Sequence, residues 1–151
     1  MMRLKAWMFI AINCLSLAAL AETEKPAPAD KCPISFQHID LRYNHAGGES
    51  KPQLELIFTN QSEQRVTGFT FSLSILDAGG YPNLYSDSLS YRAGLEPDKK
   101  RISLWSLKLA AVDIHHSGET AILQKVEFVD GSTWTDSGSQ ECKITVDFHS
   151  Q

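Results

Sequence analysis

The strongest constraint on the fold of this chain is the alternation of apolar and polar residues between Leu54 and Gly80, which read LELIFTNQSEQRVTGFTFSLSILDAGG. A period of two is typical of a β-strand with one face in a core and the other in water. In the second half the apolar positions are Phe69, Phe71, Leu73 and Ile75, and the polar positions between them are Thr70, Ser72 and Ser74. Two such runs, joined by the polar connector 60–65, predict an antiparallel β-hairpin.

Similar runs elsewhere in the chain predict further strands at Cys32–Tyr43, Arg101–Leu109, Glu119–Val129 and Cys142–Phe148. The weakly alternating segment Tyr81–Gly94 is expected to form an edge strand or an irregular crossover. The first strand changes parity, from Ile34 and Phe36 to Ile39, which indicates a β-bulge or a strand that passes between sheets. About seven strands without a long helix predict an all-β fold, an immunoglobulin-like two-sheet antiparallel sandwich over residues 32–149.

Asp130-Gly131 is a strong turn signal between the strand at 119–129 and a strand that contains Trp134. A two-residue loop would place Trp134 opposite Glu127, on the wet face. A three-residue loop with Gly131 left-handed would pair it with Val126, on the core face. Burying an indole removes far more apolar area from water, so the three-residue loop is favoured. On the strand at 119–129, the residues expected to face the core are Ile122, Val126 and Phe128.

Residues 1–21 have the organisation of a secretory signal peptide. Arg3 and Lys5 provide a positive start, residues 6–20 carry no charge, and small residues precede a cleavage site at Ala21. A membrane anchor needs about 20 apolar residues, so cleavage is favoured over retention. The charged, proline-containing stretch 22–31 is expected to be a flexible linker. The predicted location is extracytoplasmic, secreted or periplasmic, with no integral membrane segment after cleavage.

Cleavage also changes the charge of the chain. Arg3 and Lys5 leave with the signal, and the formal net charge falls from −4 to −6. An acidic domain without a basic cluster argues against nucleic acid and anionic membrane surfaces as partners. All three methionines lie in the signal segment, which disfavours a Cu(I) site built from thioethers. No cofactor is expected.

Two cysteines, Cys32 and Cys142, remain after cleavage. An even number of cysteines in an oxidising compartment predicts a disulfide, here between the first and last strands. The alternative is two separate buried thiols. A metal site is disfavoured because neither cysteine has a second Cys or His at ligand spacing.

The sequence offers little catalytic chemistry, and no catalytic residue is predicted. A nucleophile elbow of the Gly-x-Ser-x-Gly type is absent from the sequence. Asp113, His115 and His116 are weak candidates for metal ligands, and a solvated loop is the favoured alternative. Asn60-Gln61-Ser62 matches a glycosylation acceptor, but the signal looks bacterial, and there the motif is more often a polar turn.

Three tyrosines, Tyr81, Tyr85 and Tyr91, lie close together in the weakly patterned segment. Exposed aromatic rings are typical of glycan-binding and protein-binding surfaces, so these residues are a candidate binding surface. The alternative is that they cover the edge of the sandwich.

With the strands assigned, residues 54–80 resemble the bacterial exported sandwich domains of the FxLYD type. Those domains share a strand ending in Asn and Ser, a second strand of alternating apolar residues, and an Asp-x-x-Gly turn. VEFVDGSTW (126–134) is similar to the late hairpin of small exported bacterial proteins. The chain departs from the FxLYD pattern because Leu76 replaces the aromatic residue before the turn aspartate. The resemblance implies an extracytoplasmic binding or structural module.

Two hypotheses of function follow from the sequence. The first is a non-enzymatic exported module that presents edge strands and loops to a protein or envelope partner. The second is a carbohydrate-binding domain that uses the Tyr81–Tyr91 segment.

Overall fold

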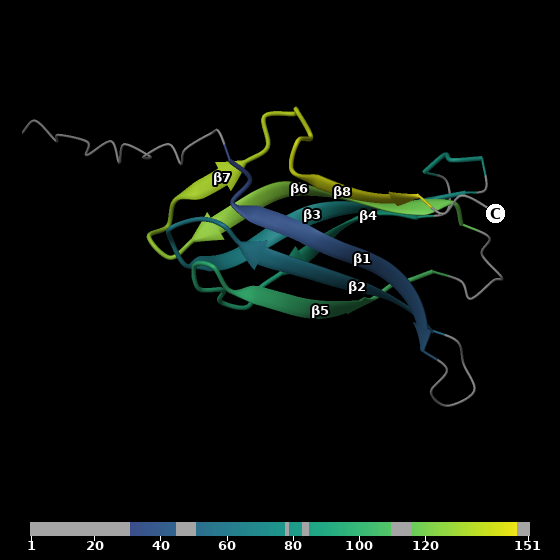
Figure 1. The fold of residues 1–151 in the computed structure, drawn as a ribbon, viewed down its shortest axis with the longest axis horizontal. Coiled ribbons are helices and arrows are strands. Elements are labelled where there is room, and N and C mark those ends of the chain that lie inside the picture. Colours follow the sequence, from purple (N-terminus) through teal and green to yellow (C-terminus); the bar gives the residue numbers. More distant parts are fainter. Residues whose placement is uncertain (1–30, 45–50, 78, 83–84, 110–115, 148–151) are drawn as a thin grey trace, which may run out of the picture.

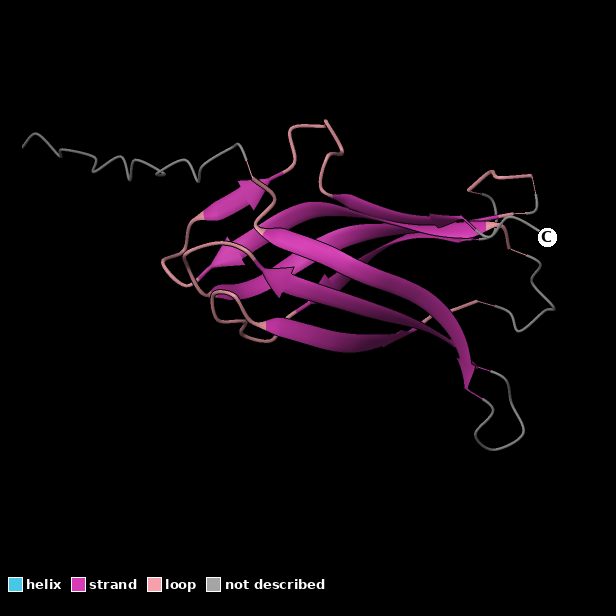
Figure 2. Cartoon of the chain, in the orientation of Figure 1, coloured by secondary structure: helices cyan, strands magenta, loops and turns pink. Residues whose placement is uncertain are grey.

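The computed structural model describes residues 31–44, 51–77, 79–82, 85–109 and 116–147. Within these ranges the chain forms eight β-strands and no helix, which confirms the predicted all-β class (Figure 1, Figure 2). The strands are β1 (Ile34–Asn44), β2 (Lys51–Asn60), β3 (Val66–Leu76), β4 (Tyr85–Tyr91), β5 (Lys100–Ser106), β6 (Gly118–Phe128), β7 (Thr133–Thr135) and β8 (Lys143–Asp147). The predicted signal peptide (1–21) and linker (22–31), except for Lys31, lie outside the described residues.

The strands form two antiparallel sheets that pack face to face, as the predicted sandwich requires (Figure 1). One sheet has the order β1-β2-β5. The other has the order β4-β3-β6-β7, and β8 also pairs with β6. In the constant-type immunoglobulin sandwich, the fourth strand lies beside the fifth. Here β4 lies beside β3 in the opposite sheet, and the rest of the order is that of an immunoglobulin-like sandwich.

The hairpin predicted from residues 54–77 is wrong, because β2 and β3 lie in different sheets. β2 pairs with β1 and β5, whereas β3 pairs with β4 and β6. β3 keeps its predicted inward face, formed by Phe69, Phe71, Leu73 and Ile75, and β2 buries Leu54, Leu56 and Phe58. Alternation specifies which side of a strand is buried but not its neighbour, so two strands facing each other across a core resemble two strands side by side.

Asn60, at the end of β2, fixes the crossover between the sheets. Its side chain is fully buried. Nδ2 donates to the carbonyl oxygens of Gln64 (2.8 Å) and Leu95 (2.9 Å), and Oδ1 accepts from the Ser62 N–H at 2.9 Å and lies 2.7 Å from the Ser62 hydroxyl. One amide therefore holds both the connection from β2 to β3 and the connection from β4 to β5. The possible glycosylation motif at Asn60 is a buried structural turn.

Aromatic rings fill the core between the sheets. The ring of Phe58 on β2 lies 4.8 Å from Phe69 on β3 and 4.9 Å from Tyr91 on β4, both edge to face. Such pairs contribute about 0.5–1.5 kcal/mol beyond area burial. Trp105 on β5 donates from Nε1 to the carbonyl oxygen of Ser90 on β4 at 3.0 Å. This bond joins the edge strands of the two sheets.

The change of parity predicted for the first strand is confirmed as a bulge. The register of β1 against β2 shifts between Phe36 and His38, which leaves Gln37 as the extra residue. Ile34 and Ile39 can therefore both be buried in the same core, although they differ in parity.

β6 contains a second bulge, at Gln124. Consecutive residues of β3 pair with Lys125 and Leu123, so Gln124 is skipped. Leu123 is fully buried before the bulge and Val126 after it, whereas Ile122 is half-buried. The expectation that Ile122 faces the core is therefore wrong, because it assumed unbroken alternation along the strand.

The predicted three-residue loop between β6 and β7 is confirmed. Val126 pairs with Trp134, and Gly131 has a φ of 84°, in the left-handed region that favours glycine. The side chain of Trp134 is buried in the core.

β7 and β8 share one strand position of the second sheet. β7 pairs with residues 125–127 of β6 and β8 pairs with residues 118–122. The strand predicted at Trp134 and the predicted last strand therefore lie one after the other along β6, with a loop between them. Cys142, at the end of this loop, is bonded to Cys32 just before β1, with the Cα atoms 5.4 Å apart. The predicted disulfide is confirmed, and it joins the two sheets.

We expect removal of the disulfide in the double variant Cys32→Ser/Cys142→Ser to lower the free energy of unfolding by up to about 4–5 kcal/mol. The reason is that the bond closes a loop with a sequence separation of 110 residues, which restricts the unfolded chain. Urea unfolding of the oxidised protein, the reduced protein and the variant measures the effect. Equal stability of all three would show that the disulfide does not stabilise the fold.

We expect Asn60→Ala to lower the free energy of unfolding by about 2–4 kcal/mol, because the buried side chain loses its hydrogen bonds to the carbonyl oxygens of Gln64 and Leu95 and to the Ser62 N–H. The matched control is Gln61→Ala, in the same connector but exposed, which should change it by less than about 0.5 kcal/mol. Thermal or urea unfolding of both variants checks this. An Asn60→Ala variant as stable as the control would contradict the assigned role.

Candidate functional site

The three tyrosines predicted to form a binding surface lie in different environments. Tyr81 is 65% exposed, and Tyr85 on β4 is half-buried. The Tyr85 hydroxyl donates to Asp87 at 3.2 Å, and burial together with the Asp87 charge raises the pKa of Tyr85. Tyr91 is 7% exposed and stacks on Phe69 in the core. Tyr91 is therefore not part of an exposed patch, and its burial agrees with the alternative that the tyrosines cover the sandwich edge.

Two of the three weak metal candidates, Asp113 and His115, lie outside the described residues. His116 is described, and its Nε2 lies 3.0 Å from Oε1 of Glu119. Within the described ranges, no group of three His, Cys, Asp or Glu side chains is placed to hold a metal ion.

Glu119 is a buried carboxyl group that was not identified from the sequence. It lies near the start of β6, opposite Ile75 of β3 and Val146 of β8, and its side chain has no solvent exposure. Oε2 has no hydrogen-bond partner among the described residues. The bulge at Gln124 turns this end of β6 so that Glu119 faces the core, whereas unbroken alternation would turn it outward. A signal that was available in the sequence is that Glu119 shares its parity with Leu123.

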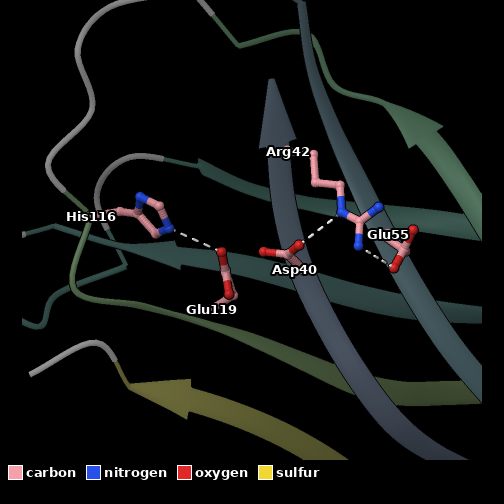
Figure 3. Close-up of polar contacts among 5 residues, drawn as sticks. All are labelled: Asp40, Arg42, Glu55, His116 and Glu119. Carbon is pink, nitrogen blue, oxygen red and sulfur yellow. Dashed lines mark hydrogen bonds and ion pairs between the residues drawn. The ribbon is translucent and has the colours of Figure 1, made fainter. Parts of the chain in front are cut away.

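Charged residues on β1 and β2 extend this polar site (Figure 3). Arg42 contacts Asp40 (Nε to Oδ2, 2.9 Å) and Glu55 (Nη2 to Oε1, 2.8 Å). Asp40 and Glu55 are direct cross-strand partners, a like-charge arrangement that Arg42 neutralises. Figure 3 shows Asp40 between Arg42 and Glu119, so the polar site runs from the surface to the buried carboxyl group.

The protonation of Glu119 depends on all of these neighbours. Burial raises the pKa of Glu119, and the charge of Asp40 adds to the rise, while His116 and the backbone N–H of Leu41 act in the opposite direction. A carboxyl group of raised pKa is a type of group that acid–base catalysts use. Catalysis also needs access for a substrate, whereas the Glu119 side chain is fully buried. The arrangement therefore fits a structural contact between β6 and β1 whose strength depends on pH.

A different kind of site lies on β5. Ile102 and Leu104 are 59% and 56% exposed, and they are the large exposed apolar side chains on the described strands. Trp105, the residue after Leu104, points to the core and contacts Phe58. Ile102 and Leu104 therefore belong to the outer face of the sheet. The sequence analysis did not assign this surface.

Comparisons with known proteins extend the description of the fold. No family model and no curated protein matches the chain. A hypothetical protein from Peptoclostridium difficile 630, solved by X-ray crystallography, is similar, with a TM-score of 0.56 and 12% sequence identity. The match covers 72% of this chain and 88% of that chain. At this identity the similarity shows the fold alone, and the resemblance to FxLYD domains stays a prediction.

The described residues include no helix that is long and apolar enough to cross a membrane.

We expect Glu119→Gln to become more stable relative to the natural chain as the pH rises. Well below the ordinary pKa of 4.5 the carboxyl group is protonated in both the folded and the unfolded state. As the pH rises, the unfolded chain releases its proton first because the folded pKa is raised, so the free energy of unfolding of the natural chain falls. Urea unfolding between about pH 4 and pH 7 measures the difference between the two proteins.

The matched control for this experiment is Glu127→Gln, at the other end of β6. Lys125 lowers the pKa of Glu127, so the stabilising effect of that carboxylate is present above its ordinary pKa and is lost as the pH falls. The two variants should therefore differ from the natural chain with opposite dependence on pH. Parallel pH profiles would contradict the assignment of Glu119 as a destabilised charge.

Proposed function

We propose that this protein is an extracytoplasmic, non-enzymatic β-sandwich module that binds a protein or envelope partner through the outer face and edge of β5. The observation that carries the proposal is the pair of exposed side chains Ile102 and Leu104. An exposed apolar patch on a folded domain is typical of an interaction site when it stands on a regular element rather than in a scattered loop.

The surroundings of these side chains add to the surface. Ile57 of β2 is the cross-strand partner of Ile102, and it lies on the same outer face of the sheet. Glu55, the partner of Leu104, is neutralised by Arg42 at 2.8 Å. The patch is therefore apolar at its centre with a paired charge at its border, as in protein–protein interfaces with an apolar core and a polar rim.

The location in the proposal is supported by the disulfide between Cys32 and Cys142. Structural disulfides persist in oxidising compartments outside the cytoplasm. The signal peptide predicted at residues 1–21 agrees with this location.

The absence of an enzymatic role is also a proposal, and it is supported by the placement of the charged side chains. The carboxyl group of Glu119, whose pKa is raised by burial, lies fully buried beside His116. Arg42 forms its ion pairs with Asp40 and Glu55, which lie in the same sheet. These contacts lie within the fold, whereas the exposed apolar surface of β5 takes no part in them.

Carbohydrate binding by the Tyr81–Tyr91 segment is the second candidate, because Tyr81 is 65% exposed. A glycan site normally needs an aromatic ring together with polar groups, and Asp87 with Ser88 on β4 are exposed nearby in the sequence. The burial of Tyr91 reduces the aromatic surface that this site offers.

The proposed function predicts that Ile102→Ser/Leu104→Ser weakens capture of the envelope partner by roughly tenfold or more, because two apolar side chains leave the interface. Capture uses immobilised residues 22–151 and a membrane and periplasmic extract, with bound proteins quantified by mass spectrometry. Val129→Ser is the matched control, since Val129 is 61% exposed but lies away from β5. Unfolding midpoints should be unchanged in both variants.

Equal capture by the natural chain and the double variant would overturn the proposed surface. A glycan array with the same proteins decides between the two candidates. Glycan binding that Tyr81→Ala abolishes and the β5 variant leaves intact would favour carbohydrate binding.

A further inference from the structure

β5 ends the three-stranded sheet, so one side of its backbone faces no other strand of that sheet in the described chain (Figure 1). The N–H of Asn60 donates to the carbonyl oxygen of Lys99, and the N–H of Leu107 donates to the carbonyl oxygen of Pro52. In an antiparallel pair, alternate residues direct their backbone groups to the partner strand. The intervening residues, Ile102 and Leu104 among them, therefore direct N–H and C=O to the free edge.

The same two residues also expose their side chains on the outer face. Natural edge strands are usually shortened, bulged or covered, because a free row of N–H and C=O groups is a template for another strand. β5 pairs with β2 in an unbroken register from Lys100 to Ser106. The edge is thus regular, and its two central residues with outward backbone groups, Ile102 and Leu104, are apolar.

The edge strand of the other sheet, β4, differs from β5 in both respects. On β4, the carbonyl oxygen of Ser90 already accepts from Trp105 at 3.0 Å. The exposed residues of β4 are polar, with Asp87 between two serines. β5 is therefore the better template for an added strand.

The charge of β5 opposes that of the protein. Four basic side chains, all exposed, lie on or beside the strand: Lys99, Lys100, Arg101 and Lys108. None of them forms an ion pair with a described carboxylate. The whole chain has a formal net charge of −4. A basic strip on an acidic protein attracts an acidic partner by charge complementarity.

We propose that β5 receives an extended, acidic segment of a partner protein as an added β-strand. This inference rests on the proposed function and specifies how the partner binds. Main-chain hydrogen bonds to Ile102 and Leu104 supply affinity, their side chains select apolar residues at alternate positions, and the basic side chains select acidic residues. A second copy of this chain is a poorer occupant, because two β5 strands side by side would bring their basic side chains together.

The direct experiment uses the folded, disulfide-bonded chain 22–151 labelled with nitrogen-15. The probe is a synthetic peptide of 7 residues, the length of β5, that alternates valine and glutamate. Hydrogen exchange at the amides of Ile102 and Leu104 should slow by roughly tenfold or more when the peptide is bound. Affinity should fall with added salt, and a peptide alternating valine and lysine should bind at least about tenfold more weakly.

Two modifications separate strand addition from simple contact with the apolar face. Leu104→Pro removes the N–H at the free edge, where proline is tolerated, and should abolish peptide binding, whereas Leu104→Ala keeps the N–H and should only weaken it. The same peptide, N-methylated along its backbone, should fail to bind the natural chain. This second arm does not depend on the folding of the proline variant.

The charge component has its own matched pair. Lys100→Glu/Arg101→Glu should weaken binding of the acidic peptide by at least about tenfold, and Lys143→Glu, an exposed basic residue on β8, should leave it unchanged. Equal effects of these variants would show a response to net charge alone and would overturn the assigned site.

Other outcomes also overturn the inference. Protection of Ile102 and Leu104 that increases with protein concentration without peptide would identify a second copy as the occupant. Binding of the N-methylated peptide would show that the edge is not used. Envelope capture that is retained in Leu104→Pro but lost in Ile102→Ser/Leu104→Ser would leave the proposed function intact and remove strand addition.

Discussion

The amide of Asn60 is the contact on which the arrangement of the two sheets depends. It bonds to the carbonyl oxygens of Gln64 and Leu95, which lie on two different connections between the sheets. Two backbone hydrogen bonds between Val66 and Leu95 lie beside the Asn60 side chain. A buried amide is costly unless its donors and acceptor are bonded, so the network specifies one geometry of the crossover. With this geometry, Phe58 and Phe69 face each other at 4.8 Å across the core.

Further contacts join the sheets at their margins. The disulfide joins Cys32 to Cys142, and the indole of Trp105 joins β5 to β4. Glu119 approaches the backbone N–H of Leu41 on the free edge of β1. The first two contacts are strong and insensitive to pH near neutrality, whereas the third places a carboxyl group where burial disfavours its charge. The polar site around Glu119 is therefore a cost to stability that the rest of the core offsets.

The free edge of β5 remains outside this system of contacts. Its inward residues take part in the core through Trp105, and its outward residues, Ile102 and Leu104, have no internal role that the described contacts reveal. The strand is thus held rigidly from one side while it exposes backbone and side chains on the other. A rigid element with a regular edge loses little conformational entropy on binding, which suits an interaction surface.

The sequence by itself determined many local properties of this protein: most of the strands, the buried face of β3, the change of parity in β1, the loop at Gly131 and the all-β class. These follow from alternation and turn chemistry, which act between residues close in the chain. Only the tertiary structure decided that β2 and β3 lie in different sheets, because a strand facing its neighbour and a strand beside it share one pattern. The same limit of the sequence pattern concealed the exposed edge of β5 and the buried site of Glu119. The basic residues 99–101 lie at an exposed edge because β5 ends its sheet, and Glu119 is buried because the bulge at Gln124 turns the end of β6 to the core.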